Sequence, residues 1–577
     1  MTAVRRLLTI ACLALAAVPL AAQTTATPAT RTTTTTGQRT TAPVTAETDE
    51  DLNNPRALRL GLDEAVRIAM QNNLGIQVQR LDYQMAGESL RGSYGIYDWL
   101  TNGTLAVSST RTPTVSQFQS SGGRSIVFDL GVNQLIPTGG TYSLGFNNSR
   151  STANGGGTFV SPAYRSNIDF NFNQPLLRNF GVDVTGRGIT IARNTLGINQ
   201  EAFRSALILT TNAVDQAYLD LVYARQNVDV VKQSLFLARD QARITQIRID
   251  VGASAPLDIL QPRVQIATFE ETLIAAVANV RDAEDRLRQL LHLPPADWDR
   301  PVIPTDPAGY TPINLDMQDA VTRAIQLRPE IREQRLTSDI RRVQYVYARN
   351  QVLPKVDFAV NYNPAGVAGR SAELDPVTGL PTGRFNSTGY SKALSQVLGN
   401  DFPSWTVGFN FGIPILNIGA RAEAKRAELD WRASRVGEQQ LQENIAVEVR
   451  STVRAVDTAA KEIVASRTAR EAAEQNLDAE RKRYENGMTT NFQVLQIQQQ
   501  LSDARVRELL DLVGYNKAVS AYHRAVGDLL EVRNIRIEEP VLANDPHLFS
   551  TFDRYNWLNY GNRLNLQEKA NDGQQPR

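Results

Sequence analysis

The residue types that most often perform catalysis or hold metal ions are scarce in this sequence. Its three histidines, His292, His523 and His547, share no spacing typical of a metal site, and its single cysteine is Cys12. The sequence contains no glycine-rich phosphate loop and no nucleophile elbow. We therefore expect no enzyme activity, no metal site and no cofactor. We interpret the histidines as surface or packing residues.

The clearest repeated pattern is a pair of phrases that each surround one glycine. RIDVGASAPLDILQPRVQ occupies residues 248–265, and RYENGMTTNFQVLQIQQQ occupies residues 483–500. An offset of 235 positions pairs Arg248 with Arg483 and Gly252 with Gly487, and several flanking residues also match. Such a spaced match indicates internal duplication. A glycine at these points permits a tight reversal that displays the neighbouring side chains.

Both glycines interrupt long stretches that favour helix. No proline occurs between residues 176 and 255 or between residues 415 and 539, and good helix formers are abundant. Apolar residues in the first stretch recur every three or four positions, as in coiled coils: Val214, Ala217, Leu221, Ala224, Val228, Val231, Leu235, Ala238 and Ala242. We expect each phrase to form the tip of an antiparallel helical hairpin. Two ordinary turns without a partner are the alternative.

The two halves also begin alike. Short amphipathic helices are expected over 60–98 and 315–352, with Asp63 and Asp316 in the positions of helix caps. Strand regions follow over 101–175 and 355–414, where polar and apolar residues alternate, as in RSNIDFNFNQ and SWTVGFNFGI. A soluble antiparallel sheet gives the same alternation, but export and the long helices favour a membrane protein.

The sequence divides into five parts. Residues 1–22 have the layout of a secretory signal peptide, and threonine-rich residues 23–57 are expected to be a disordered linker. Repeat 1 covers 58–313, with a helical hairpin over 186–292 and a tip near 252. Repeat 2 covers 314–535, with a hairpin over 419–530 and a tip near 487. Residues 536–577 form a C-terminal tail.

Composition excludes several classes of protein. The 61 basic and 60 acidic residues balance, so no nucleic-acid partner is implied. Cys12 lies inside the signal, which leaves no disulfide in the exported chain; a lipid anchor at Cys12 is the less favoured alternative. Because no later stretch is apolar enough for a membrane-spanning helix, any span must be a closed β-barrel.

In the order of its elements and in its tip phrases, the sequence closely resembles the TolC-type outer-membrane efflux protein family, roughly from 58 to 535. RYENGMTTNFQVL is especially similar to that family's second hairpin tip, and QPLLRNFG at 174–181 is similar to the start of its helical barrel. The resemblance implies a mixed fold of α-helix and membrane β-sheet with an internal two-fold repeat. Each subunit of a homotrimer would give four strands to a twelve-stranded outer-membrane β-barrel, which a long periplasmic coiled-coil α-barrel continues. A surplus strand-like run in the first half does not fit four strands, and we expect it to lengthen or cover a hairpin.

The function that the resemblance implies is passive conduction through an outer-membrane channel of a tripartite efflux or type I secretion system. Its partners would be outer-membrane lipid, a periplasmic adaptor of the membrane fusion protein class and an inner-membrane transporter. The sequence does not name the cargo. A structural coiled-coil envelope protein, or the adaptor itself, is the alternative. An adaptor would usually have one hairpin, whereas this sequence has two, each preceded by amphipathic strands.

The resemblance also assigns residues at the tips. The residues that correspond to the family's adaptor-docking region form two sets. They are Arg248, Gly252, Ala253, Ser254 and Leu257 at the first tip, and Arg483, Gly487, Met488, Thr489 and Phe492 at the second. The periplasmic gate falls on Asp258, Tyr484, Gln493 and Gln496. Well-studied members of the family have aspartates where this chain has the two glutamines. Because amide rings attract cations less than carboxylate rings do, strong cation selectivity is not expected here.

Overall fold

The structure is a computed structural model that describes residues 57–113, 115, 121–154, 160–374, 376 and 381–535. All of these residues belong to one unit, Glu50–Arg577. The expected signal segment, the linker up to residue 56 and the tail from residue 536 lie outside the described residues, as do Cys12 and His547.

Two pairs of short helices occur in similar places in the two halves of the chain. The first pair is α2 (Leu62–Asn72) and α3 (Leu74–Ser93), and the second is α7 (Met317–Leu327) and α8 (Pro329–Gln351). Asp316 caps α7, since its carboxylate accepts a bond of 2.7 Å from the Asp319 amide. The expectation for Asp63 was wrong, because Gly61 is the N-cap of α2 and Asp63 lies in the first turn.

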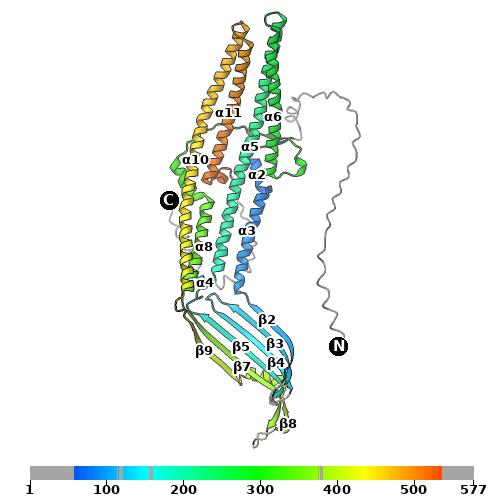
Figure 1. Cartoon of the computed structure of the whole chain (residues 1–577), viewed down its shortest axis with the longest axis vertical. Helices are drawn as coiled ribbons and strands as arrows, with labels where there is room; N and C mark the ends of the chain where they lie inside the picture. Colours follow the sequence, from blue (N-terminus) through cyan, green and yellow to red (C-terminus); the bar gives the residue numbers. More distant parts are fainter. Residues whose placement is uncertain are drawn as a thin grey trace, which may run out of the picture. The chain divides into compact units, whose positions relative to one another are not determined.

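The helical part of the chain is dominated by two hairpins (Figure 1). The first pairs α5 (Arg187–Asp250) with α6 (Leu260–Leu291), and the second pairs α10 (Ile418–Glu485) with α11 (Asn491–Val526). At about 1.5 Å per residue, the 68 residues of α10 extend about 100 Å. Shorter helical segments are α4 (Val182–Thr185), α12 (Leu529–Val532) and the 3₁₀ turns Tyr94–Tyr97, Pro256–Ile259 and Pro295–Asp297.

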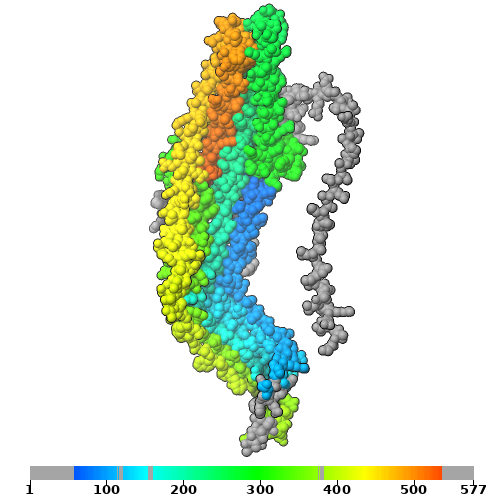
Figure 2. All heavy atoms as spheres, viewed as in Figure 1, coloured from blue at the N-terminus to red at the C-terminus, as the bar shows by residue number. Residues whose placement is uncertain are grey.

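The predicted heptad series on α5 forms the buried seam of the first hairpin. Its residues from Val214 to Ala238 are buried, while the last member, Ala242, is only half buried. They pack against Phe269, Leu273 and Ala276 of α6. Helix α5 also contacts α11 of the second hairpin, and the space-filling view shows the two hairpins side by side (Figure 2). Helix α5 is therefore packed on two sides.

The strands form one antiparallel sheet with the order β2-β3-β4-β5-β7, in which β9 also pairs with β7. The long strands are β2 (Leu100–Arg111), β3 (Gly122–Leu135), β4 (Thr141–Asn154), β5 (Val160–Pro175), β7 (Lys355–Leu374) and β9 (Pro403–Gly412). The short β8 (Pro381–Ser387) pairs with the far end of β7. A separate parallel pair joins β1 (Leu58–Leu60) to β6 (Val302–Pro304).

The strand count differs from the one that the family resemblance implies. Among the described residues, six strands of ten residues or more lie in one sheet, whereas the resemblance implies four. The surplus run in the first half neither lengthens nor covers a hairpin. It forms full strands, since β3 and β4 pair along their whole length and β4 pairs with β5 in continuous register.

The sheet has one polar face and one apolar face, because neighbouring residues of a strand point to opposite sides. The apolar face bears exposed large side chains: Phe128, Leu130, Leu144, Phe170, Trp405, Val407, Phe409 and Phe411. The other face bears Asp129, Asn147, Asn167, Asp169, Asn171, Asn361 and Asn363. Asp169 accepts hydrogen bonds from the side-chain amides of Asn147, Asn167 and Asn363. Within the described residues, no helix combines the length and the apolar character needed to cross a membrane.

Candidate functional site at the hairpin tips

The first tip is a tight turn closed by backbone hydrogen bonds. Helix α5 ends at Asp250, and Gly252 adopts φ +76°. The amides of Ala253 and Ser254 then bond to the Arg248 carbonyl at 2.7 and 3.2 Å. This pattern satisfies carbonyls at the helix end and requires a left-handed residue, for which glycine is best suited.

The second tip repeats this geometry. Helix α10 ends at Glu485, Gly487 adopts φ +73°, and the Met488 amide bonds to the Arg483 carbonyl at 2.9 Å. Thr490 caps the returning helix, since its side chain accepts a hydrogen bond from the Gln493 amide. At the first tip, the Asp258 carboxylate accepts a bond of 3.1 Å from the Ala255 amide.

The structure places the residues assigned to docking around both turns. Within this chain, Gly252, Ala253, Leu257, Arg483, Gly487, Met488 and Phe492 are exposed, and Arg248, Ser254 and Thr489 are partly buried. Leu257 is 74% exposed, Met488 is 70% and Phe492 is 57%. Large apolar side chains that protrude from a helical tip are typical of surfaces that bind a partner.

The residues assigned to the gate divide into two groups. Asp258, Gln493 and Gln496 are exposed, whereas Tyr484 is only 6% exposed. The Tyr484 ring packs among Leu477, Val494 and Ile497, between the two helices of the second hairpin. Its hydroxyl is buried and has no hydrogen-bond partner within the described residues.

Arg248 joins the two hairpins at Tyr484. Its Nη1 donates a hydrogen bond of 2.7 Å to the Tyr484 carbonyl, and its guanidinium lies 4.6 Å from the centre of the Tyr484 ring. The matching residue of the second half behaves differently, since Arg483 pairs with Glu480 of its own helix at 3.2 Å. The tips therefore share a backbone turn but differ in their side-chain contacts.

A buried polar layer below the tips escaped prediction from the sequence. Asn491 Oδ1 accepts a bond of 2.8 Å from Gln241 Nε2 and another of 3.3 Å from Thr245 Oγ1. Further along the same two helices, α5 and α11, the Ser234 hydroxyl forms a hydrogen bond of 2.9 Å with the Ser502 hydroxyl. The sequence did contain an indication of this layer. Polar residues recur about one or two helical turns apart on α5, in a stripe beside the apolar heptad series.

The second tip holds an ion pair that shifts a pKa. The Asp478 carboxylate, which accepts a bond of 2.6 Å from Lys482 Nζ, raises the pKa of the Lys482 amine. Gln493 and Gln496 add neutral amides beside the second turn. The described part of the chain holds no group of three His, Cys, Asp or Glu side chains placed for a metal ion.

Comparison with known proteins gives one family. The family model described as "Outer membrane efflux protein" matches residues 141–292 and 320–527. The outer membrane protein TolC of Escherichia coli (strain K12) is 22% identical over 379 residues, which cover 62% of this chain and 70% of TolC.

Solved structures are similar over most of the chain. The outer-membrane channel OprN aligns with a TM-score of 0.59 and 15% identity, over 83% of this chain and 91% of OprN. The Campylobacter jejuni CmeC outer membrane channel aligns with a TM-score of 0.56 and 16% identity, over 86% of this chain and 91% of CmeC. At these identities the likeness concerns the fold.

Proposed function

Because this chain belongs to the outer membrane efflux protein family, we propose that it is the channel of a tripartite efflux pump or a type I secretion system. As a member of this family it is an outer-membrane protein with a periplasmic helical extension. In the proposed role it conducts exported solutes passively, and an inner-membrane transporter supplies the energy. A periplasmic adaptor connects the two.

The observation that supports the proposal best is the two-faced sheet that leads directly into the helices. Exposed side chains such as Phe128, Trp405 and Phe411 cost free energy in water, at about 25 cal/mol per Å² of apolar surface, and lipid removes that cost. The opposite face bears Asn and Asp side chains suited to a water-filled passage. Strand β5 ends at Pro175, and the short helix α4, which begins at Val182, connects it to α5.

The free edges of the sheet favour a closed assembly of several copies. Among the described residues, β2 pairs only with β3, and β9 pairs only with β7. Unpaired backbone groups are costly in lipid, so each edge needs a partner. The six long strands alternate in direction, so β2 and β9 run in opposite directions and can pair between subunits. We propose a homotrimer, the assembly that the family resemblance implies.

The hairpin tips are the proposed docking surface for the adaptor. The small residues Gly252, Ala253 and Ser254 leave space for a partner helix, and the exposed Leu257, Met488 and Phe492 offer apolar area for it to cover. Gln493 and Gln496 would lie at the entrance, where neutral amides select weakly by charge.

The proposal is tested with the whole protein purified from membranes in mild detergent. We expect it in the outer-membrane fraction, as a trimer that survives electrophoresis without heating. On heating it should migrate as a monomer somewhat smaller than the 63.7 kDa of the full sequence, because the signal peptide is removed. Reconstituted into planar bilayers, it should conduct ions without a nucleotide or another energy source. Recovery as a soluble monomer, or as a trimer that never conducts, would refute the channel and favour a structural coiled-coil protein.

A further inference from the structure

A short helix lies on the apolar face of the sheet, near the strand ends that are remote from the hairpins. Helix α9 (Tyr390–Gly399) contacts β5 and β7. Its approach is close, because a Cβ on Gly366 would lie 2.0 Å from the Ala393 carbonyl oxygen. Gly366 pairs with Ser166, and Ser166 points to the same side of β5 as Phe170. Helix α9 therefore covers part of the face that we assign to lipid.

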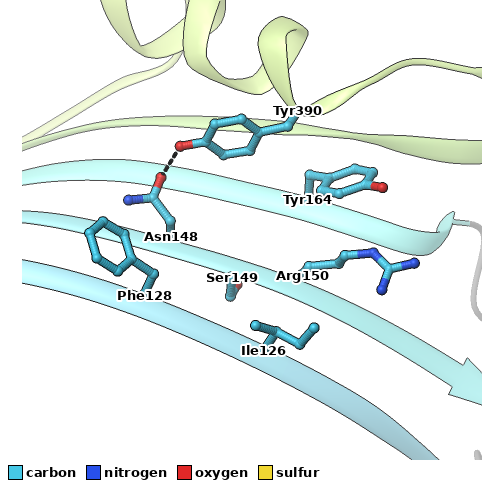
Figure 3. Close-up of a pocket in the computed structure, with 7 residues that line it drawn as sticks. All are labelled: Ile126, Phe128, Asn148, Ser149, Arg150, Tyr164 and Tyr390. Atoms are coloured by element: carbon cyan, nitrogen blue, oxygen red, sulfur yellow. Dashed lines mark hydrogen bonds between the residues drawn. The ribbon is translucent and has the colours of Figure 1, made fainter. Parts of the chain in front are cut away.

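A hollow of about 320 Å³ opens where α9 begins (Figure 3). Its lining residues come from β3, β4, β5 and α9, and they are Ile126, Phe128, Asn148, Ser149, Arg150, Tyr164 and Tyr390. This volume lies at the lower end of the range for small-molecule sites, roughly 300–1,000 Å³. Aromatic and aliphatic side chains supply most of the wall, and none of the lining residues is acidic.

Asn148 presents an unused hydrogen-bond donor at this hollow. Its Oδ1 accepts bonds from the Tyr390 hydroxyl at 2.5 Å and from the Ser166 hydroxyl at 2.8 Å. These two bonds fix the amide, so that Nδ2 is left as the free end. Asn148 is only 8% exposed, and its Nδ2 is buried without a partner among the described residues. A buried donor left unpaired lowers stability, and a bound acceptor would remove that cost.

Arg150 adds a positive charge on the same face. It is directly opposite Tyr164 in the register of β4 with β5, and its guanidinium lies 5.9 Å from the centre of the Tyr164 ring. No carboxylate is among the residues that line the hollow with it. Figure 3 shows Arg150, Asn148 and Tyr164 on the same side of the strands, beneath Tyr390. The hollow thus combines a cation, an amide donor and apolar walls.

We propose that this hollow binds a phosphorylated lipid of the outer leaflet. The lipid phosphate pairs with the Arg150 guanidinium, Asn148 Nδ2 donates a hydrogen bond to an ester or amide carbonyl, and an acyl chain lies over Phe128 and Ile126. The position agrees with that leaflet, because β5 starts here at Val160 and reaches the periplasmic helices at its other end. The inference rests on the proposed function, which places the apolar face in the membrane. A free phosphate ion would leave the apolar walls uncovered.

The test measures lipid binding to the intact detergent-purified protein by native mass spectrometry. The probes are diphosphoryl lipid A and its dephosphorylated form, with inorganic phosphate as competitor. We expect wild type to retain the phosphorylated probe, and Arg150→Gln to weaken its binding about tenfold, the loss of one charge-assisted contact. Arg165→Gln is the matched control, because Arg165 lies one residue beyond Tyr164 on β5 and faces the opposite side of the sheet.

Three results would overturn the lipid site. They are equal binding by wild type and Arg150→Gln, equal binding of the two probes to wild type, and displacement of the lipid by millimolar inorganic phosphate. The comparison of probes uses wild type alone, so it remains decisive if a variant fails to fold. Conductance of the same preparation is measured separately in neutral bilayers. A protein that conducts without binding the probe refutes only the lipid site, and one that binds without conducting refutes only the channel.

Discussion

At the scale of single residues, the two tips use the same backbone turn for different side-chain tasks. Arg248 crosses to the second hairpin and bonds to Tyr484, while Arg483 stays on its own helix. The repeated phrases contain an arginine at both positions, but the sequence does not indicate which arginine contacts the other hairpin. That depends on the placement of α5 beside α11, which is a tertiary property.

The Arg248 contact predicts an effect on gating. Replacing Arg248 with Ala removes a charge-assisted hydrogen bond worth about 1.5–3 kcal/mol and a cation–π contact worth about 0.5–1 kcal/mol. The tips should then separate more readily, and the mean conductance of single channels in planar bilayers should rise. Arg483→Ala is the control, since it removes an ion pair between the exposed Arg483 and the buried Glu480 of the same helix and no contact between the hairpins. Equal conductance in the two variants would show that Arg248 does not restrain the entrance.

The tip glycines predict an effect on adaptor coupling. Gly252→Val with Gly487→Val forces a β-branched residue to positive φ, at a cost of about 1–2 kcal/mol per residue. Since nothing lies within 4 Å of a Cβ at either position, the trimer should still assemble, while cellular export should fall. Asparagine tolerates this conformation, so the double Asn variant should export better than the double Val variant. Normal export by the Val variant would contradict the assignment of the tips to adaptor docking.

The glutamines near the second tip predict weak charge selection. In the variant Gln493→Asp with Gln496→Asp, three copies would place a ring of carboxylates at the entrance, where divalent cations bind. Conductance of reconstituted channels should then become sensitive to added divalent cations, whereas the wild type should respond little. A variant as insensitive as wild type would place these residues away from the conduction path.

At the scale of elements, alternation and heptad spacing predicted the strands and the long helices well. The stripe from Val214 to Ala238 is buried as expected. An apolar repeat of seven residues forms a stripe along one side of a helix, and the partner helix covers that stripe. The polar stripe of Ser234, Gln241 and Thr245 could not be assigned, because polar residues beside an apolar seam usually face water. Helix α9 was also missed. A helix of ten residues is marginal alone and forms here because Ala393 and Val397 pack on the sheet.

The polar layer between α5 and α11 predicts a stability effect that depends on its partner. Asn491→Leu leaves the Gln241 amide, only 1% exposed, without its acceptor, and should lower the free energy of unfolding by about 1–3 kcal/mol. Adding Gln241→Leu removes the unpaired donor and should restore part of the loss. Hydrogen exchange of tip amides and thermal unfolding would measure both. Additive losses in the double variant would contradict a coupled pair.

At the scale of the whole molecule, the number of strands decides the width of the proposed passage. The sequence resemblance implied four strands per subunit, but the described residues supply six long strands in one antiparallel sheet from β2 to β9. The discrepancy arose because a family pattern fixes the order of elements better than the number of hairpins inserted in a variable region. An even number per subunit preserves the alternation of strand direction where subunits meet, so six is as compatible with closure as four.

Three copies would therefore close a ring of eighteen strands, where the resemblance implied twelve. Since the diameter of such a ring grows roughly linearly with strand number, we expect it to be about one and a half times as wide. The helical tips would remain the narrowest point, so the extra width acts at the exit and admits bulkier cargo there. Electron cryomicroscopy of the trimer in lipid nanodiscs would count the strands directly. A twelve-stranded ring with two strands of each subunit folded outside it would contradict the predicted strand number. The width is tested with large neutral polymers added from the strand side, and their exclusion from the passage would contradict the greater width.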